Sequence, residues 1–160
     1  MSKEKFDTLC LFGLTVEYPR SWMFMTSAKQ NTFSNGRVNL IGEDILVGLL
    51  WEHLKHHEID LQGYRDKIKK SLEKKEKRFS LLSSNSIEIN GHPAFLENME
   101  TAGRSGPIGL RKEPVHHIHC IFFCPESERF ITLYTSLLPK LRGEYEYIVN
   151  RLYSTITCIH

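Results

Sequence analysis

The sequence contains no apolar run long enough for a membrane helix, which needs about 20 consecutive apolar residues. Its longest apolar stretch, from Leu46 to Trp51, suits a buried strand instead. The first residues, Met1 to Asp7, are charged and are followed by no apolar segment typical of a secretory signal. We therefore predict a cytoplasmic protein without a membrane span.

Close-spaced cysteines are also missing. The four cysteines, Cys10, Cys120, Cys124 and Cys158, show neither the spacing of a disulfide framework nor that of a zinc ribbon. In a chain without an export signal this pattern predicts reduced thiols. Cys158 would be able to join Cys10 or Cys124 at a metal, but exposure near the end of the chain is the favoured interpretation.

No catalytic motif of high specificity is present. The chain has no Gly-x-Ser-x-Gly nucleophile elbow, and no cysteine has the surroundings typical of a protease. The segment from Gly103 to Gly109 is rich in glycine but lacks the Gly-Lys-Ser/Thr ending of a phosphate-binding loop. The formal net charge of +2 is too small to indicate a nucleic acid partner. We predict no catalytic residues and no cofactor.

The strongest local signal is a hairpin in the segment from Ser86 to Glu100. Ile87 and Ile89 alternate with polar residues, and Asn90-Gly91 tolerates the positive φ angles of a tight turn. Asn35-Gly36 is a second turn signal of the same kind. Further alternating or apolar runs predict strands at 12–16, ended by Pro19, and at 22–26, 38–41, 45–51, 115–124 and 130–136.

Two segments have helical periodicity. Asp60 is a good N-cap for a helix from Asp60 to Lys77, in which Leu61, Tyr64, Ile68 and Leu72 form one apolar stripe. A second stripe predicts a helix from Glu144 to Thr155. Seven or eight strands with these helices predict an α+β fold, a single domain over 1–160. We expect an antiparallel β-sheet flanked by helices, an α/β/α sandwich.

Three segments resemble the superfamily that contains the PsbP subunit of photosystem II, the Ran-binding nuclear import factor and the bacterial DcrB-like proteins. They are Glu17-Tyr-Pro-Arg-Ser-Trp22, Ile87-Glu-Ile-Asn-Gly-His-Pro-Ala94 and Leu152-Tyr-Ser-Thr-Ile156. The resemblance implies the PsbP-like fold. It also implies a non-enzymatic binding, assembly or chaperone-like function, and some members serve bacterial secretion systems.

The segment from Val115 to Cys124 contains the most suggestive group of potential metal ligands. On a strand, His117 and His119 project from one face, where the pair could bind one metal ion, as zinc chemistry requires. A third ligand with telling spacing is missing. A strand whose histidine-rich end reaches solvent is therefore favoured, and a metal-dependent protein that uses His117 and His119 stays the alternative.

Basic residues form two candidate surfaces for a partner. Lys70, Lys74 and Lys77 lie opposite the apolar stripe of the first helix, although pairs such as Asp66 with Lys70 are also typical of a solvated helix face. The second surface is a loop expected from Ala102 to Glu113, which carries Arg104, Arg111 and Lys112. We predict that these six residues bind another protein.

Overall fold

The computed structural model describes residues 3–26, 31–54, 59–76, 78–105 and 111–158. Most of this part of the chain is antiparallel sheet, with two α-helices, as the sequence predicts. Neither helix within the described residues is long and apolar enough to cross a membrane.

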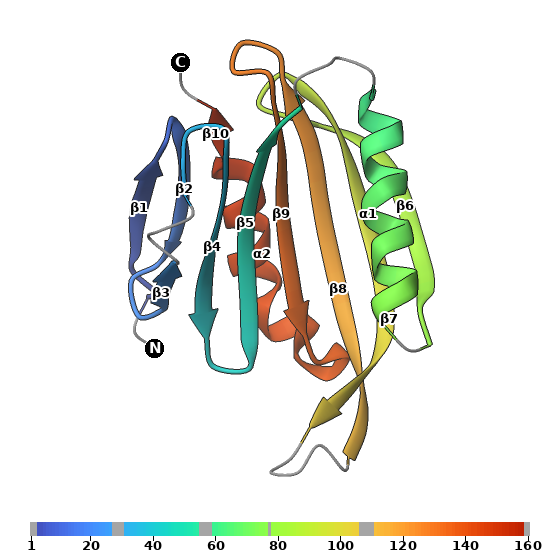
Figure 1. Ribbon diagram of the computed structural model, residues 1–160. Coiled ribbons are helices and arrows are strands. Elements are labelled where there is room, and N and C mark those ends of the chain that lie inside the picture. Colours follow the sequence, from blue (N-terminus) through green and yellow to red (C-terminus); the bar gives the residue numbers. More distant parts are fainter. Residues whose placement is uncertain (1–2, 27–30, 55–58, 77, 106–110, 159–160) are drawn as a thin grey trace.

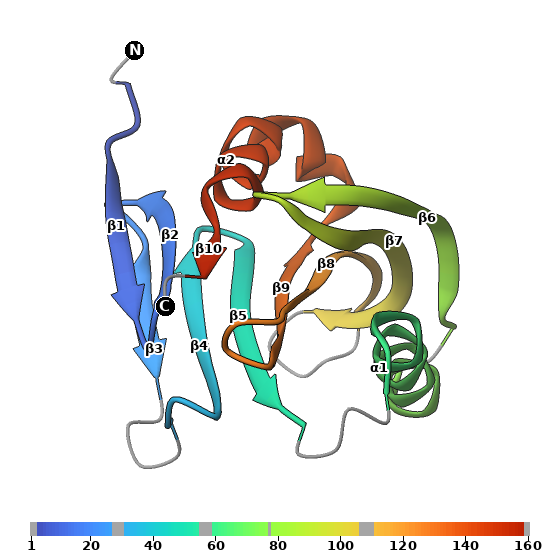
Figure 2. The ribbon, with the colours of Figure 1, turned by 90° about the horizontal axis from the view of Figure 1, so that it is seen from above.

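A curved sheet of seven strands forms the centre of the molecule (Figures 1 and 2). Every neighbouring pair in it is antiparallel, so the predicted strand direction is confirmed. In spatial order the strands are β3 (Met23–Thr26), β4 (Asn35–Gly42), β5 (Ile45–His53), β9 (Arg129–Leu137), β8 (Arg111–Cys124), β7 (His92–Ser105) and β6 (Ser80–Ile89).

A smaller sheet lies beside the first. It consists of β1 (Phe6–Leu11), β2 (Leu14–Pro19) and β10 (Thr157–Cys158), with β2 in the centre. Through its pairing with β2, the short strand β10 thus lies beside the first strands of the chain. Cys158 is half-buried there, so the exposure expected at this position is wrong.

Helix α2 (Arg142–Thr155) covers one face of the large sheet. Val149 and Leu152 are buried in the same core as Val47, Leu133 and Phe122 from the sheet. The Tyr153 hydroxyl donates to the Ile118 carbonyl oxygen at 2.9 Å, and the Arg151 guanidinium donates to Glu17 on β2 at 2.6 Å. This helix therefore joins both sheets.

Helix α1 (Leu61–Lys75) lies on the opposite face (Figure 2). Asp60 caps it as predicted, because its side chain accepts from the Gly63 N–H at 2.8 Å. Tyr64 is buried and stacks on Phe130 with ring centroids 4.3 Å apart. This core is small, and α1 covers only the part of the face around β8, as Figure 1 shows.

Turn chemistry is partly as predicted. Asn90 and Gly91 both have positive φ, which confirms the turn of the β6–β7 hairpin. Asn35 and Gly36 instead begin β4, so the predicted turn there is wrong. The glycine serves a different purpose, because a Cβ at Gly36 would lie 2.1 Å from Cζ2 of the Trp51 ring that packs across it.

The first predicted strand is also displaced, since Phe12 lies in the β1–β2 turn with φ of 49°.

The largest correction concerns the expected loop from Ala102 to Glu113. Strand β7 continues to Ser105 and β8 begins at Arg111, with Arg104 paired to Lys112 and Ser105 to Arg111. Pro114 is tolerated in β8 because β9 pairs only as far as His116, so the strand has one neighbour at this point. The two strands extend past the rest of the sheet as an arm (Figure 1), and residues 106–110 lie outside the described part.

Candidate binding face

Helix α1 covers only part of its face of the large sheet. The uncovered part of that face is hollowed, and we call it the open face. A hollow of about 900 Å³ lies over β3, β4 and β5, with Met25, Asn39 and Leu50 in its lining. A second hollow of about 340 Å³ lies between α1 and the sheet. Both are lined by Arg37 and Leu50, so the two hollows adjoin.

Strand register decides which side chains line the second hollow. Gly48 pairs with Asn39 on one side and Tyr134 on the other, and Tyr134 pairs with His119. Directly opposed residues of antiparallel strands share a face, so this row crosses four strands. Ser136 and His117 form a neighbouring row. On α1, Ser71, Leu72 and Lys75 close the hollow.

The absence of a side chain at Gly48 shapes the floor of the open face. The Tyr134 ring lies across β5, where a Cβ at Gly48 would be only 1.8 Å from its Cζ atom. The Tyr134 hydroxyl consequently reaches β4 and donates to Asn39 Oδ1 at 2.8 Å. Arg37 lies over the same ring, 5.5 Å from its centroid. The sequence pattern predicts no role for Tyr134 or Gly48.

The two predicted histidines do project together into this hollow. His117 is hydrogen-bonded through Nε2 to Thr101 Oγ1 at 2.8 Å and through Nδ1 to Ser136 Oγ at 2.9 Å. His119 is buried, and its Nδ1 has no hydrogen-bond partner among the described residues. Such a buried polar atom costs free energy unless something binds it.

Burial disfavours the protonated form of both histidines. It lowers the pKa of His119 to about 3, with a further contribution from His117. Burial also lowers the pKa of His117, although the Glu76 carboxylate opposes this shift. A neutral His119 offers an uncharged hydrogen-bonding group to whatever occupies the hollow.

A metal at His117 and His119 gains no support from this geometry. Both ring nitrogens of His117 are already hydrogen-bonded, and the two ring centroids are 6.5 Å apart. Within the described part of the chain, the histidine, cysteine and carboxylate groups whose ligand atoms converge are His92, Cys124 and Glu126, at the far end of β8.

Neither Lys70 nor Lys74 of α1 is among the residues that line the two hollows. Lys70 and Lys74 are exposed and form no ion pair with any described residue, so the expected Asp66–Lys70 pair is absent. Lys75 lines the second hollow. Lys77 lies outside the described residues.

The backbone places the other three predicted residues on the arm. Arg104, Arg111 and Lys112 are strand residues near its tip, not members of a loop. The arm lies at the same end of the molecule as the C-terminus of α1 (Figure 1). The C-terminal part of α1 and the strands of the arm, separate in sequence, therefore lie at one end of the fold.

An apolar edge borders the open face on the side away from α1. Met23, Phe24 and Met25 of β3 are 58%, 38% and 50% exposed, unusually high for consecutive apolar strand residues. Met25 pairs with Asn39 and shares its face. The sequence predicted this strand but not its exposure, because alternation does not reveal which neighbours a strand will have.

No family model matches the sequence, and no curated protein matches it. Solved structures do match. CyanoP, the PsbP of Synechocystis, has a TM-score of 0.67 at 10% identity, over 99% of this chain and 95% of its own. The yeast Ran-binding protein Mog1p from Saccharomyces cerevisiae has 0.62 at 6%, over 98% and 96%. This chain has the PsbP/Mog1 fold.

A third match shares the fold without adding a function. A Pseudomonas aeruginosa protein of unknown function has a TM-score of 0.60 at 15% identity, over 95% of this chain and 96% of its own. The similarity runs through nearly the whole length of each chain. It confirms the fold-level resemblance that the three sequence segments indicate.

We expect acid to destabilise the fold through His119. Unfolding raises its pKa from about 3 to the ordinary 6.5, so the unfolded chain binds the extra proton as pH falls through this window. At pH 5 this linkage removes about 2 kcal/mol from the free energy of unfolding relative to pH 7.5. Urea denaturation of the wild type and His119→Gln at both pH values measures it.

The His119→Gln variant should lose most of the pH dependence of the free energy of unfolding, whatever its stability at pH 7.5. His53→Gln is the control, because His53 is partly exposed beside Glu128. An equal pH dependence in the wild type and in His119→Gln would contradict the assignment.

Replacing Gly48 with alanine should displace the Tyr134 ring and break its hydrogen bond to Asn39. Overpacking of this kind costs about 1–3 kcal/mol of stability. Gly143→Ala is the matched control, since a Cβ there meets nothing within 4 Å and alanine favours the helix by about 0.5 kcal/mol. Denaturant titrations measure the stabilities of both variants. Equal stabilities of Gly48→Ala and Gly143→Ala would contradict the close approach of the Tyr134 ring to Gly48.

Proposed function

We propose that this protein is a non-enzymatic module that binds a segment of another protein on its open face. The observation that carries the proposal is the pair of adjoining hollows between α1 and the exposed edge strand β3. In the proposed scaffold, α2 and the small sheet stabilise one face of a helix–sheet–helix sandwich, and the other face is left for recognition.

The size and lining of the open face suit a polypeptide segment. The larger hollow, about 900 Å³, is at the upper end for small-molecule pockets and is bordered by apolar side chains such as Met25 and Leu50. Methionine adapts to differently shaped apolar partners. The smaller hollow adds hydrogen-bonding groups from His119 and Tyr134, which would fix the register of the segment.

The charges around the open face favour an acidic segment. Arg37 and Lys75 line it, against Glu52 and Glu76, and Lys70 and Lys74 are exposed on the same helix as Lys75. Glu52 is already engaged, since it accepts from the Tyr64 hydroxyl at 2.8 Å and lies 3.8 Å from Lys67 Nζ. We extend the basic surface to Lys77 and to Arg104, Arg111 and Lys112 of the arm.

The fold supports this proposal in general terms. Mog1p, which has the same fold, is a Ran-binding protein, so a sheet and helices of this arrangement are able to recognise a protein. At 6% identity the partner itself is not carried over. We place the present protein in the cytoplasm, where its four cysteines would remain reduced, without disulfides.

Site-specific photo-crosslinking in the native host tests the location of the partner. A photoreactive amino acid at Ser71 or Met25, which line the two hollows, should capture the same protein. Placed at Tyr147 of α2, 63% exposed away from the open face, it should capture none of it. Mass spectrometry identifies the product. Equal capture from all three positions, or different proteins from Ser71 and Met25, would contradict the proposal.

Reversing two charges tests the role of the α1 lysines. We expect Lys70→Glu with Lys74→Glu to weaken binding of that partner by about tenfold, and wild-type binding to weaken with added salt. Lys5→Glu with Lys140→Glu changes the net charge equally, at exposed positions away from the open face, and should bind as the wild type. Calorimetry measures the affinities. Equal weakening in both double variants would indicate a net-charge effect and exclude a specific role of Lys70 and Lys74.

A further inference from the structure

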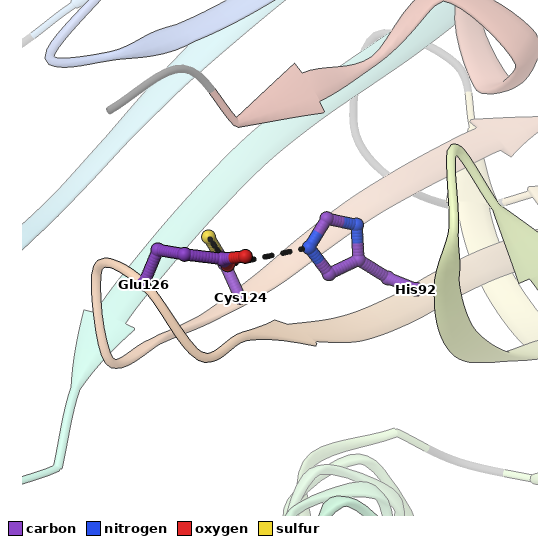
Figure 3. Close-up of side chains that lie close together, drawn as sticks. All are labelled: His92, Cys124 and Glu126. Atoms are coloured by element: carbon purple, nitrogen blue, oxygen red, sulfur yellow. Dashed lines mark hydrogen bonds and ion pairs between the residues drawn. The ribbon is translucent and has the colours of Figure 1, made fainter.

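Three different metal-binding groups converge at the end of β8 (Figure 3). His92 begins β7, Cys124 ends β8, and Glu126 lies in the turn that follows. The Cys124 thiol donates to Glu126 Oε2, with the two atoms 3.6 Å apart, and His92 Nε2 lies 3.8 Å from the same oxygen. Their ligand atoms all lie within 4.8 Å of one another.

Strand register and a short turn bring these groups together. Ala94 pairs with Phe122, so two residues further along each strand His92 comes opposite Cys124 on the same face. This is the face that α2 covers, opposite to the open face, since Cys124 is buried in the core that contains Leu152. The turn to Arg129 then places Glu126 beside both side chains.

Two of the three separations are close to those required by tetrahedral zinc, and the third, between Cys124 Sγ and His92 Nε2, is within 4.8 Å. Bonds of about 2.3 Å to sulfur and 2.0–2.1 Å to nitrogen and oxygen imply about 3.3–3.6 Å between ligand atoms. The 3.6 and 3.8 Å distances lie within a few tenths of an ångström of these values. We propose that His92, Cys124 and Glu126 form a Zn²⁺ site with a fourth, solvent-facing position.

The chemistry of the three groups favours zinc over calcium or magnesium. A thiolate and an imidazole are ligands for borderline metals, whereas calcium and magnesium prefer oxygen ligands alone. One thiolate and one carboxylate neutralise the two charges of the ion. Glu126 is about half exposed, which leaves the fourth position accessible to water.

Cys158 lies beside this site but has partners of its own. Its sulfur accepts from Arg129 Nη2 at 3.5 Å and lies 3.3 Å from Ser127 Oγ. Arg129 is fully buried and also donates to the carbonyl oxygens of Phe12 and Phe33. The cation holds Cys158 toward itself, so we assign the thiolate ligand to Cys124.

Zinc binding would release one proton and involves no oxidation. The S–H bond of Cys124 breaks, the Zn–S bond forms, and the proton passes to solvent. Because the thiolate and not the thiol is the ligand, apparent affinity should rise with pH.

Metal titration of the full chain, freed of any affinity tag and stripped with chelator, tests the site. We expect one Zn²⁺ per chain in competition with a chromogenic chelator. With Co²⁺ we expect a thiolate charge-transfer band and the visible bands of tetrahedral coordination. His92→Gln, Cys124→Ser and Glu126→Gln should each weaken zinc binding at least about 100-fold, since even loss of an outer-shell partner costs 10–100-fold.

Two controls separate this site from other thiols and imidazoles. Cys10→Ser removes an exposed cysteine on β1, and His117→Gln removes a histidine of the open face, so both should bind zinc as the wild type. His92→Gln and Glu126→Gln alter partly exposed side chains, so circular dichroism should show intact folding even if Cys124→Ser is unstable.

Substoichiometric zinc, a cobalt spectrum without the thiolate band, or binding that survives His92→Gln and Glu126→Gln would each overturn the proposal. Loss of binding in His117→Gln with retention in His92→Gln would move the metal to the open face and overturn it equally. The outcome is independent of photo-crosslinking at Ser71 and Met25, because the two sites lie on opposite faces.

Discussion

The pairing of β8 between β7 and β9 is the constraint on which the rest of the structure depends. It assigns alternate residues of β8 to opposite faces, so His117, His119 and Ile121 point toward α1 while Cys120, Phe122 and Cys124 point into the core beneath α2. A shift of one residue would exchange the two sets and bury different side chains. The open face and the group formed by His92, Cys124 and Glu126 both follow from this register.

The two faces differ because their coverings differ. Beneath α2, a continuous core of aliphatic and aromatic side chains extends from the large sheet to β2, and the polar residues buried there, such as His116, Arg129 and Thr135, form hydrogen bonds. The α1 core is small, centred on Tyr64, Ile121 and Phe130. Beyond it the sheet carries polar side chains, among them Arg37, Tyr134 and His117. The open face is thus a product of incomplete coverage.

Local patterns in the sequence predicted the elements well wherever one face of an element is apolar and a turn or cap marks its end. Asp60 and Asn90-Gly91 served in this way, and their conformations confirm the predictions. The predictions failed where a glycine makes room for a neighbouring side chain or a proline lies in a strand segment with one neighbour. Gly36 lies beneath Trp51, and Pro114 lies where β8 has lost one neighbour. Neither role is visible without the partner strand.

The antiparallel architecture and the two helices could be predicted from the sequence, because hydrophobic period and turn chemistry act over a few neighbouring residues. Three short segments carried the fold-level resemblance. Which polar groups meet became visible only in the folded chain. His92 and Cys124 belong to different strands, and Glu126 reaches them through a turn. The neighbours of His119 come likewise from β9 and α1. Such proximities depend on strand order and register, which are set by the packing of the whole chain.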